Sequence, residues 1–261
     1  MDLNLKGKNA FVGGSSKGIG KASAIELSRL GASVTLVGRN PASLSEALSE
    51  LQHSADQDHD YLIADFSDVK DLHKKVRGLA AQKKIHILVN NTGGPPGGPI
   101  TEARPVEFIQ ALNNHLICNH LLAQTFLPGM KEAGYGRIIN IISTSVKQPI
   151  DGLGVSNATR GAVGNWAKTL ANEVGPFGIT VNNVLPGFTK TGRLEEIAGE
   201  RAKKAGTSTE GIFEFWKKVT PLRRIADPSE IANAVAFLAS PAASYISGIN
   251  LPVDGGRTKS L

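Results

Sequence analysis

A glycine-rich stretch near the amino terminus has the residues and the spacing of a phosphate-binding turn. It reads Gly13-Gly14-Ser15-Ser16-Lys17-Gly18-Ile19-Gly20 and lies between a short apolar run and an amphipathic segment that continues to Leu30. Glycines at the second, sixth and eighth places allow a tight turn, a close approach of a pyrophosphate, and tight packing of the following helix. The amino terminus of that helix would face the phosphates. The stretch therefore predicts a dinucleotide site.

The end of the second apolar run indicates which nucleotide is bound. A protein that binds NAD(H) places an Asp or Glu there, on the ribose 2′-hydroxyl. This run ends Gly38-Arg39-Asn40 and carries no acid. Arg39 and Lys17 instead offer two cations to a 2′-phosphate, a contact that charge makes strong. We therefore expect NADP(H) rather than NAD(H).

The same turn also satisfies the Gly-x-Ser-x-Gly pattern of a hydrolase nucleophile elbow, through Gly14, Ser16 and Gly18. That site needs an acid and then a histidine later in the chain, yet the last histidine is His120. The elbow would also follow the first strand, where no earlier strand can supply an oxyanion loop. Both observations disfavour a hydrolase.

Short β-branched runs alternate with longer amphipathic segments along the whole chain. The runs predict seven strands, at 9–13, 33–37, 61–64, 85–89, 137–142, 180–185 and 250–253. Most are apolar on both faces, which is typical of parallel strands covered by helices on each side. Asn40-Pro41 and Asp227-Pro228 mark helix starts. We expect an α/β fold over residues 1–261: a single-domain, Rossmann-like doubly wound parallel sheet with helices on both faces.

Composition excludes several classes of function. The chain has 261 residues, of which 41% are hydrophobic, and its 29 basic and 23 acidic side chains give a net charge of +6. The basic residues lie in short scattered clusters without a reader motif, so we expect no nucleic-acid partner. A single cysteine, Cys118, excludes an internal disulfide framework. No apolar leader or span is present, so we expect a cytoplasmic protein without a membrane partner.

Taken together, these motifs resemble the short-chain dehydrogenase/reductase family over essentially the whole chain, and most closely its 3-oxoacyl-[acyl-carrier-protein] reductases. Asn90-Asn91-Thr92-Gly93 resembles the family's Asn-Asn-Ala-Gly strand end, and Val253-Asp254-Gly255-Gly256 its C-terminal strand. The resemblance implies cofactor contacts from Gly14, Ser16, Lys17, Gly18, Ile19, Gly20, Arg39, Asp65, Phe66, Asn91, Thr92, Gly93, Arg160, Pro186, Gly187, Thr189 and Thr191. It also implies a homotetramer and a small-molecule carbonyl or acyl substrate.

At the family's catalytic positions the chain departs from the pattern. The family's serine matches Ser143, but its Tyr-x-x-x-Lys is replaced by Ser156-Asn157-Ala158-Thr159-Arg160, and its helix asparagine by His115. A phenol beside an ammonium exchanges protons near neutrality, whereas an aliphatic hydroxyl does not. Arg160 keeps the positive charge and can hold ribose hydroxyls, but it does not lose its proton.

His115 is the side chain near this site whose ordinary pKa lies closest to physiological pH. It is either a general acid or a residue that packs the helix or holds a water molecule. Ser143 either orients a carbonyl or makes an ordinary hydrogen bond at the end of its strand. We expect no metal, because His115 and His120 do not share a helix face and no other cluster has ligand spacing.

The expected activity is reduction of a carbonyl, of 3-oxoacyl or other ketone type, by an NADP(H)-dependent oxidoreductase with an atypical active site. The alternative is a protein that holds NADP(H) without turnover, as a sensor or a partner subunit. Residues 192–220 match the family's substrate-covering segment. The aromatics near its end, Phe213, Phe215 and Trp216, either line a hydrophobic pocket or dock the segment onto the body.

Overall fold

Continuous aliphatic runs become the strands of one parallel sheet. The computed structural model describes residues 1–260, in which seven strands have the order β3-β2-β1-β4-β5-β6-β7. They are β1 Asn9–Val12, β2 Ser33–Gly38, β3 Asp60–Ile63, β4 Ile87–Asn90, β5 Gly136–Ile141, β6 Ile179–Pro186 and β7 Asn250–Val253. All seven predicted strands are confirmed, with ends that differ by no more than two residues.

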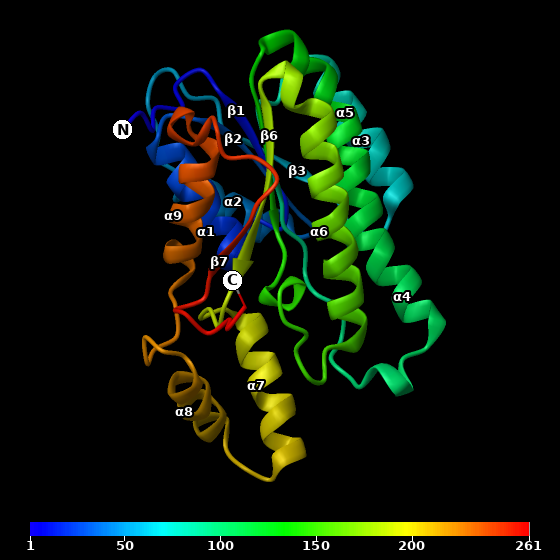
Figure 1. Cartoon of the computed structure of the whole chain (residues 1–261). Helices are drawn as coiled ribbons and strands as arrows, with labels where there is room; N and C mark the ends of the chain where they lie inside the picture. Colours follow the sequence, from blue (N-terminus) through cyan, green and yellow to red (C-terminus); the bar gives the residue numbers. More distant parts are fainter. Residues whose placement is uncertain (261) are drawn as a thin grey trace.

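Helices cover both faces of the sheet, as the apolar strands require (Figure 1). One face packs on α1 Gly18–Arg29, α2 Pro41–Ser49 and α9 Pro228–Ala239. The other packs on α3 Val69–Gln82, α5 Cys118–Ala133 and α6 Gly154–Val174. The predicted doubly wound fold is therefore confirmed.

The two predicted helix starts are built as their sequences indicate. The Asn40 side chain accepts a hydrogen bond from the Ser43 N–H, and Pro41 begins α2. Asp227 and Glu230 form a capping box at the start of α9, next to Pro228. Both starts satisfy backbone N–H groups that no helical carbonyl can reach.

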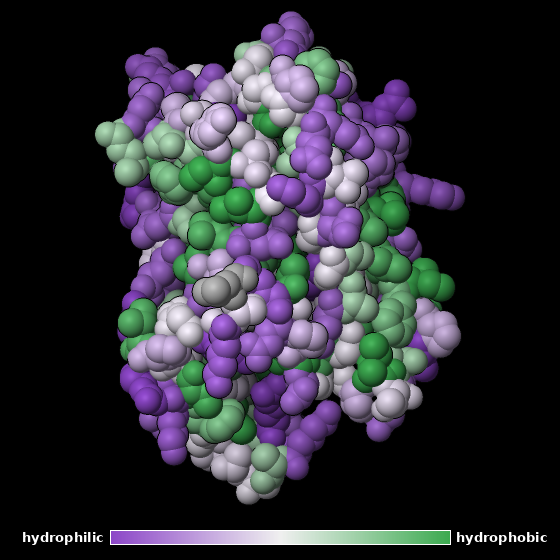
Figure 2. Space-filling view, viewed as in Figure 1, coloured by the Kyte–Doolittle hydropathy of each residue, from purple (hydrophilic) through white to green (hydrophobic). Residues whose placement is uncertain are grey.

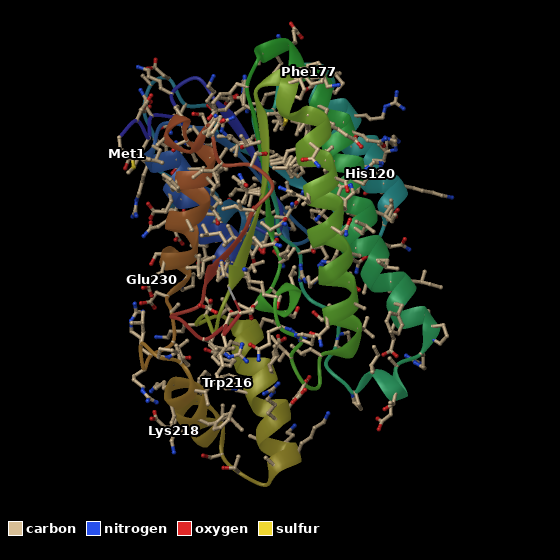
Figure 3. The ribbon with its side chains drawn as sticks, in the orientation of Figure 1. Met1, His120, Phe177, Trp216, Lys218 and Glu230 are labelled. Carbon is tan, nitrogen blue, oxygen red and sulfur yellow. The ribbon has the colours of Figure 1, made fainter. Side chains whose placement is uncertain are left out.

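Two further helices lie beyond the carboxyl ends of the strands (Figure 1). These are α7 Gly192–Ala205 and α8 Thr209–Val219, within the predicted covering segment. They have an apolar cluster of their own, built on Leu194, Ala198 and Trp216, and Figure 3 shows Trp216 between them. The Phe188 ring stacks on Trp216 at 4.7 Å between centroids, which ties the pair to the end of β6.

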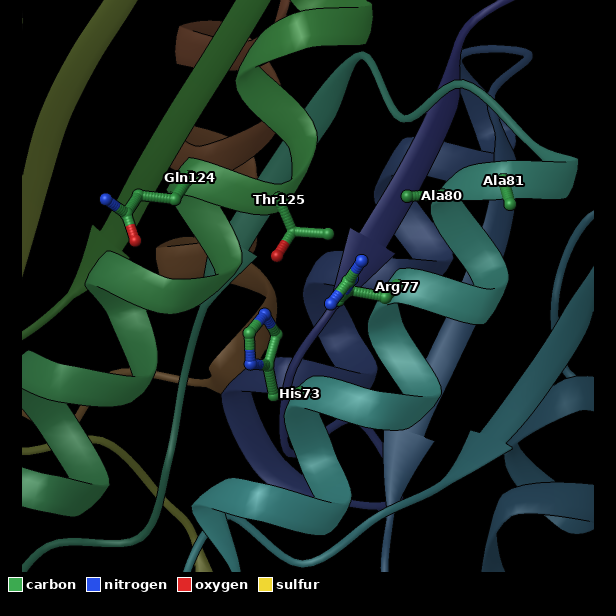
Figure 4. A pocket seen from close by; sticks show the side chains of 6 residues that line it. All are labelled: His73, Arg77, Ala80, Ala81, Gln124 and Thr125. Carbon is green, nitrogen blue, oxygen red and sulfur yellow. The ribbon is translucent and has the colours of Figure 1, made fainter.

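The exterior of the molecule mixes polar and apolar residues. Figure 2 shows apolar side chains gathered over α4 Pro105–Leu112, where Val106 and Ile109 are exposed. An open groove of about 380 Å³ separates α3 from α5 and is lined by His73, Arg77, Ala80, Ala81, Gln124 and Thr125 (Figure 4). Within residues 1–260, no helix combines the length and the apolar character needed to cross a bilayer.

A row of asparagines crosses half of the sheet on the α5 and α6 side. Asn90, Asn140, Asn183 and Asn250 are direct partners on β4, β5, β6 and β7. Each side-chain amide donates to the Oδ1 of the next residue in this order, at 2.8 Å. The row gives partners to polar groups that would be costly if left alone in the interior, although Asn90 Oδ1, at its start, is buried without one among residues 1–260.

Candidate functional site

The glycine turn after β1 has the backbone that the sequence predicts. Gly14 and Gly18 have φ angles of +55° and +60°, a region that favours glycine. A Cβ on Gly20 would lie 2.3 Å from the Gly14 carbonyl oxygen, so only glycine fits there. The turn is therefore a close-packed backbone cradle at the carboxyl end of β1.

Two polar side chains hold this cradle in place. Asn91 donates from Nδ2 to the carbonyls of Gly13 and Gly14, at 3.0 and 3.2 Å. The buried Ser15 hydroxyl donates to the Val12 carbonyl and accepts from the Val37 N–H, both at 2.8 Å. The sequence predicts Asn91 at the site. It does not predict the role of Ser15, because nothing in the pattern separates Ser15 from Ser16.

The first turn of α1 is open to an anion. Lys17 is the residue that precedes the helix, and no side chain caps the free N–H groups there. Those groups and the helix dipole favour phosphate at this point. On the neighbouring strand end the Arg39 side chain is 78% exposed, 4.0 Å from the Asp65 carboxylate. These residues would thus fit NADP(H), with its diphosphate at the amino terminus of α1 and its ribose 2′-phosphate near Arg39.

Further predicted cofactor residues follow other strands and lie at the same edge of the sheet. They are Asp65 and Phe66 after β3, Asn91, Thr92 and Gly93 after β4, and Pro186, Gly187, Thr189 and Thr191 at or after the end of β6. A Cβ on Gly18 would lie 3.3 Å from Thr191 Cγ2. The glycine turn and the segment before α7 are therefore in contact.

His115 lies in a π-helical turn, Asn113–Ile117, between α4 and α5. Such turns occur often at functional sites. The residue is only 2% exposed, and its Nδ1 lies 2.6 Å from Thr92 Oγ1. Burial, with a smaller contribution from the positive charge of Arg160, lowers the pKa of His115 to about 2. The imidazole is therefore neutral at physiological pH and lacks the proton that an imidazolium acid would donate.

Ser143 and Arg160 meet the end of β5 from two directions. Ser143 directly precedes a short 3₁₀ turn, Thr144–Val146, and its Oγ accepts a hydrogen bond from the Ser145 N–H at 3.1 Å. Arg160 reaches back from α6, is 7% exposed, and donates from Nη1 to the Ile141 carbonyl at 3.1 Å. Ser156 is half-buried one helical turn before Arg160.

The tyrosines of the chain do not replace the phenol that the resemblance leads one to expect. Tyr135 lies just before β5, at the amino end of the sheet, and its hydroxyl donates to the Ala239 carbonyl at 2.6 Å. Tyr61 lies in the edge strand β3, and Tyr245 follows α9 on the exposed surface.

Two arginines hold α7 over the loops beside the site. Arg193 donates to the Pro95 carbonyl at 2.8 Å, and Arg201 to the Asp151 carbonyl at 3.2 Å. Those carbonyls belong to the glycine- and proline-rich loop after β4 and to the segment before α6. The sequence does not predict these contacts, because pairing between distant loops leaves no local pattern.

Known proteins share both the sequence and this arrangement. The family model described as Enoyl-(Acyl carrier protein) reductase matches residues 14–258. A 3-oxoacyl-[acyl-carrier-protein] reductase of Pseudomonas aeruginosa is 33% identical over 261 residues, which cover 99% of this chain and 100% of the relative. Gluconate 5-dehydrogenase of Gluconobacter oxydans is 31% identical over 263 residues, 99% of this chain and 98% of the relative.

Solved structures extend the likeness to the fold. The crystal structure of L-sorbose reductase from Gluconobacter frateurii, complexed with NADPH and L-sorbose, superposes with a TM-score of 0.92 at 32% identity and covers 100% of both chains. The sequence matches, the sheet order and the glycine cradle all indicate the same family. The chain belongs to the short-chain dehydrogenase/reductase family of oxidoreductases.

Proposed function

We propose that this protein is an NADP(H)-dependent oxidoreductase that reduces the carbonyl group of a small molecule at a modified active site. The observation that carries the proposal is the cradle at Gly14, Gly18 and Gly20, which opens onto the uncapped amino terminus of α1. Its structural relatives include reductases solved with NADPH or NADP bound. The choice of NADP(H) rests on Arg39, which follows β2 where NAD(H) would call for an acid.

When bound, NADPH supplies the hydride. The protein's own groups then have to hold and polarise the carbonyl. The Ser143 oxygen accepts from a backbone N–H, which leaves its O–H free to donate to a substrate oxygen. Burial lowers the pKa of Arg160 to about 10, so the guanidinium stays charged at physiological pH.

His115 acts as a positioning residue in this scheme. Its imidazole is neutral and faces Thr92, so it holds the strand end after β4 rather than giving up a proton. Neither the Ser156 hydroxyl nor the Arg160 guanidinium is an acid near neutrality. We therefore expect water to protonate the product oxygen. Proton transfer should then be the slow step of the reaction at this site.

The test compares the wild-type protein with the double variant Ser156→Tyr, Arg160→Lys. NADPH consumption is followed with a panel of uncharged ketones, acyl thioesters and ketoses. Because the variant adds a phenol beside an ammonium, its kcat for an uncharged ketone should rise by about 10²- to 10⁴-fold.

The control is the affinity for NADPH, measured by fluorescence titration, which should be similar in both proteins. Wild-type protein that binds NADPH but consumes none with any compound would show a nucleotide-holding protein instead. Failure to bind NADPH at all would refute the proposal.

A further inference from the structure

The hairpin formed by α7 and α8 packs largely on itself (Figure 1). Its apolar cluster, built on Leu194, Ala198 and Trp216, is separate from the two large clusters on the faces of the sheet. At the base of the hairpin the chain leaves the body after Thr189 and returns at Ala226, and these two residues pair through a parallel bridge. The hairpin is therefore a unit that can turn about its base without disturbing the sheet.

The returning segment at this base holds a strained residue. Arg223 has a φ of +57°, and among residues 1–260 it is the one non-glycine residue with a positive φ. Residues held in this region cost energy and cluster at ligand clamps and switch segments. The preceding residue, Leu222, donates its N–H to the carbonyl of Gly255, which has a φ of +65°. The strain marks this segment as the place where the hairpin bends.

Away from the base, two arginines of α7 bond main-chain carbonyls of the body. Arg193 Nη2 donates to the Pro95 carbonyl at 2.8 Å, and Arg201 Nη2 donates to the Asp151 carbonyl at 3.2 Å. Gly98 joins the two segments that carry these carbonyls, through hydrogen bonds of both its N–H and its own carbonyl. The arginines thus hold α7 against one continuous rim.

Both arginines also have a partner inside the hairpin. Arg193 Nη1 lies 3.3 Å from a Glu196 carboxylate oxygen, and the Arg201 guanidinium lies 6.0 Å from the Trp216 ring centre. These partners move with α7 when the hairpin turns. Opening therefore breaks the bond from each arginine to the rim without leaving either charge alone.

The start of α7 lies against the glycine turn. A Cβ on Gly18 would lie 3.3 Å from Thr191 Cγ2, and the Thr191 side chain caps α7 by accepting from the Leu194 N–H. The diphosphate of a bound nucleotide is expected at that turn. With its first turn at Gly18 and its arginines on the rim, α7 covers the way out of the nucleotide site.

We propose that Arg193 and Arg201 are a latch that holds α7 and α8 closed over the bound nucleotide and sets the rate of its release. The inference rests on the proposed function, because it concerns the nucleotide of that same site. Both are positioning residues, since they act through the placement of α7 and not on the reacting atoms.

Release is measured by stopped flow, as the loss of fluorescence when excess NADP⁺ displaces bound NADPH. In the double variant Arg193→Ala, Arg201→Ala release should be about 10- to 100-fold faster, because two hydrogen bonds from charged groups are lost. Lysine at both positions keeps a charged donor and should restore part of the slow release. The control is Arg29→Ala, at the last residue of α1, where the guanidinium bonds Glu26 of its own helix. It should release NADPH at the wild-type rate.

Closure is tested in the free protein with a protease that cuts after lysine, because the substitutions leave every lysine in place. A helix of 14 residues such as α7 is marginal in water once it loses its packing partners. Cleavage at the exposed Lys203 and Lys204 should therefore be faster in the double variant, by about the same factor as release. The Tm should stay that of the wild type, since the core of the sheet is untouched.

The outcomes separate this inference from the proposed function. Unchanged release in the double variant would overturn the latch, whether or not cleavage is faster, while NADPH binding upholds the proposed function. Faster cleavage of a protein that binds no NADPH would uphold closure by the two arginines, but it would remove both the nucleotide and the oxidoreductase proposal.

Discussion

His115 shows how far surroundings can change a residue whose type suggests acid-base chemistry. Free histidine titrates near neutrality, but the π-helical turn before α5 buries this imidazole against Thr92 and near the Arg160 charge. Its pKa of about 2 leaves it neutral over the whole physiological range. A substitution of His115 by a hydrogen-bonding side chain of similar length should therefore preserve its role.

The pH dependence of turnover tests this role. Because the pKa of His115 is about 2, wild-type kcat should show no histidine ionisation between about pH 5 and pH 8. His115→Asn should keep most of the activity and the same pH profile, since an amide can still bond Thr92. A fall in wild-type kcat near pH 6.5 that vanishes in His115→Asn would instead identify the imidazole as the proton donor.

The role of Arg39 is tested by the ratio of the Kd values for NADPH and NADH. Arg39→Ala removes a charged contact to the 2′-phosphate and should raise the Kd for NADPH by about 10- to 100-fold. The Kd for NADH should change much less. Fluorescence titration measures both. Arg77→Ala, which removes a cation from the groove between α3 and α5, serves as the control. Equal wild-type affinity for NADPH and NADH would contradict the assignment of NADP(H).

At the level of elements, the sequence predicts the strands better than it predicts the protonation and pairing of the side chains at the site. The β4 and β5 strands can be predicted because buried parallel strands are continuous apolar runs. The protonation state of His115 cannot be predicted from the sequence, because its pKa is lowered mainly by burial and to a smaller extent by Arg160, which α6 brings near from a distant part of the chain. The same holds for Arg160, because its burial and its lack of a carboxylate partner among residues 1–260 depend on all the elements packed around it. Residue type indicated where the site is, and packing decides what its side chains can do.

Two strands depend on histidines that must stay neutral. His59 Nδ1 accepts from the Val34 N–H on β2, and His86 Nδ1 from the Asn9 N–H on β1, both at 3.0 Å. Burial, the largest cause in each case, lowers the pKa of both. Their folded-state pKa values therefore lie below the unfolded value of about 6.5. The stability that they contribute is complete above that pH and is lost as the pH falls through the folded values.

Thermal unfolding at a series of pH values measures this effect. The wild-type Tm should fall between about pH 7 and pH 5, and the double variant His59→Gln, His86→Gln should lose less over that range, by about 2 to 4 °C. Buried His115 adds a loss of the same sign in both proteins. His73→Gln, at an exposed position, should behave as wild type. Identical pH dependence in the wild type and the double variant would show that these two contacts do not couple to protonation.

At the scale of the whole molecule, we expect the tetramer that the family resemblance implies. Its contacts should come from α6 and from the carboxyl-terminal segment, with the exposed apolar surface over α4 close by. Light scattering on the purified protein should return about 110 kDa, four times the chain mass of 27.5 kDa. A mass equal to that of a single chain would refute the expectation.

The asparagine row has a consequence for the order in which the fold is completed. Its amides meet only when β4, β5, β6 and β7 stand in sequence with the observed register, because a slip by one residue turns a side chain to the other face. The row thus penalises misaligned sheets as well as stabilising the native one. Asn250 comes from the last strand in chain order, so a chain emerging from the ribosome cannot close the row until β7 has been made. The bond from Asn183 to Asn250 therefore forms last, and removing it with Asn250→Ala should hasten unfolding more than it slows folding, as stopped-flow kinetics would measure.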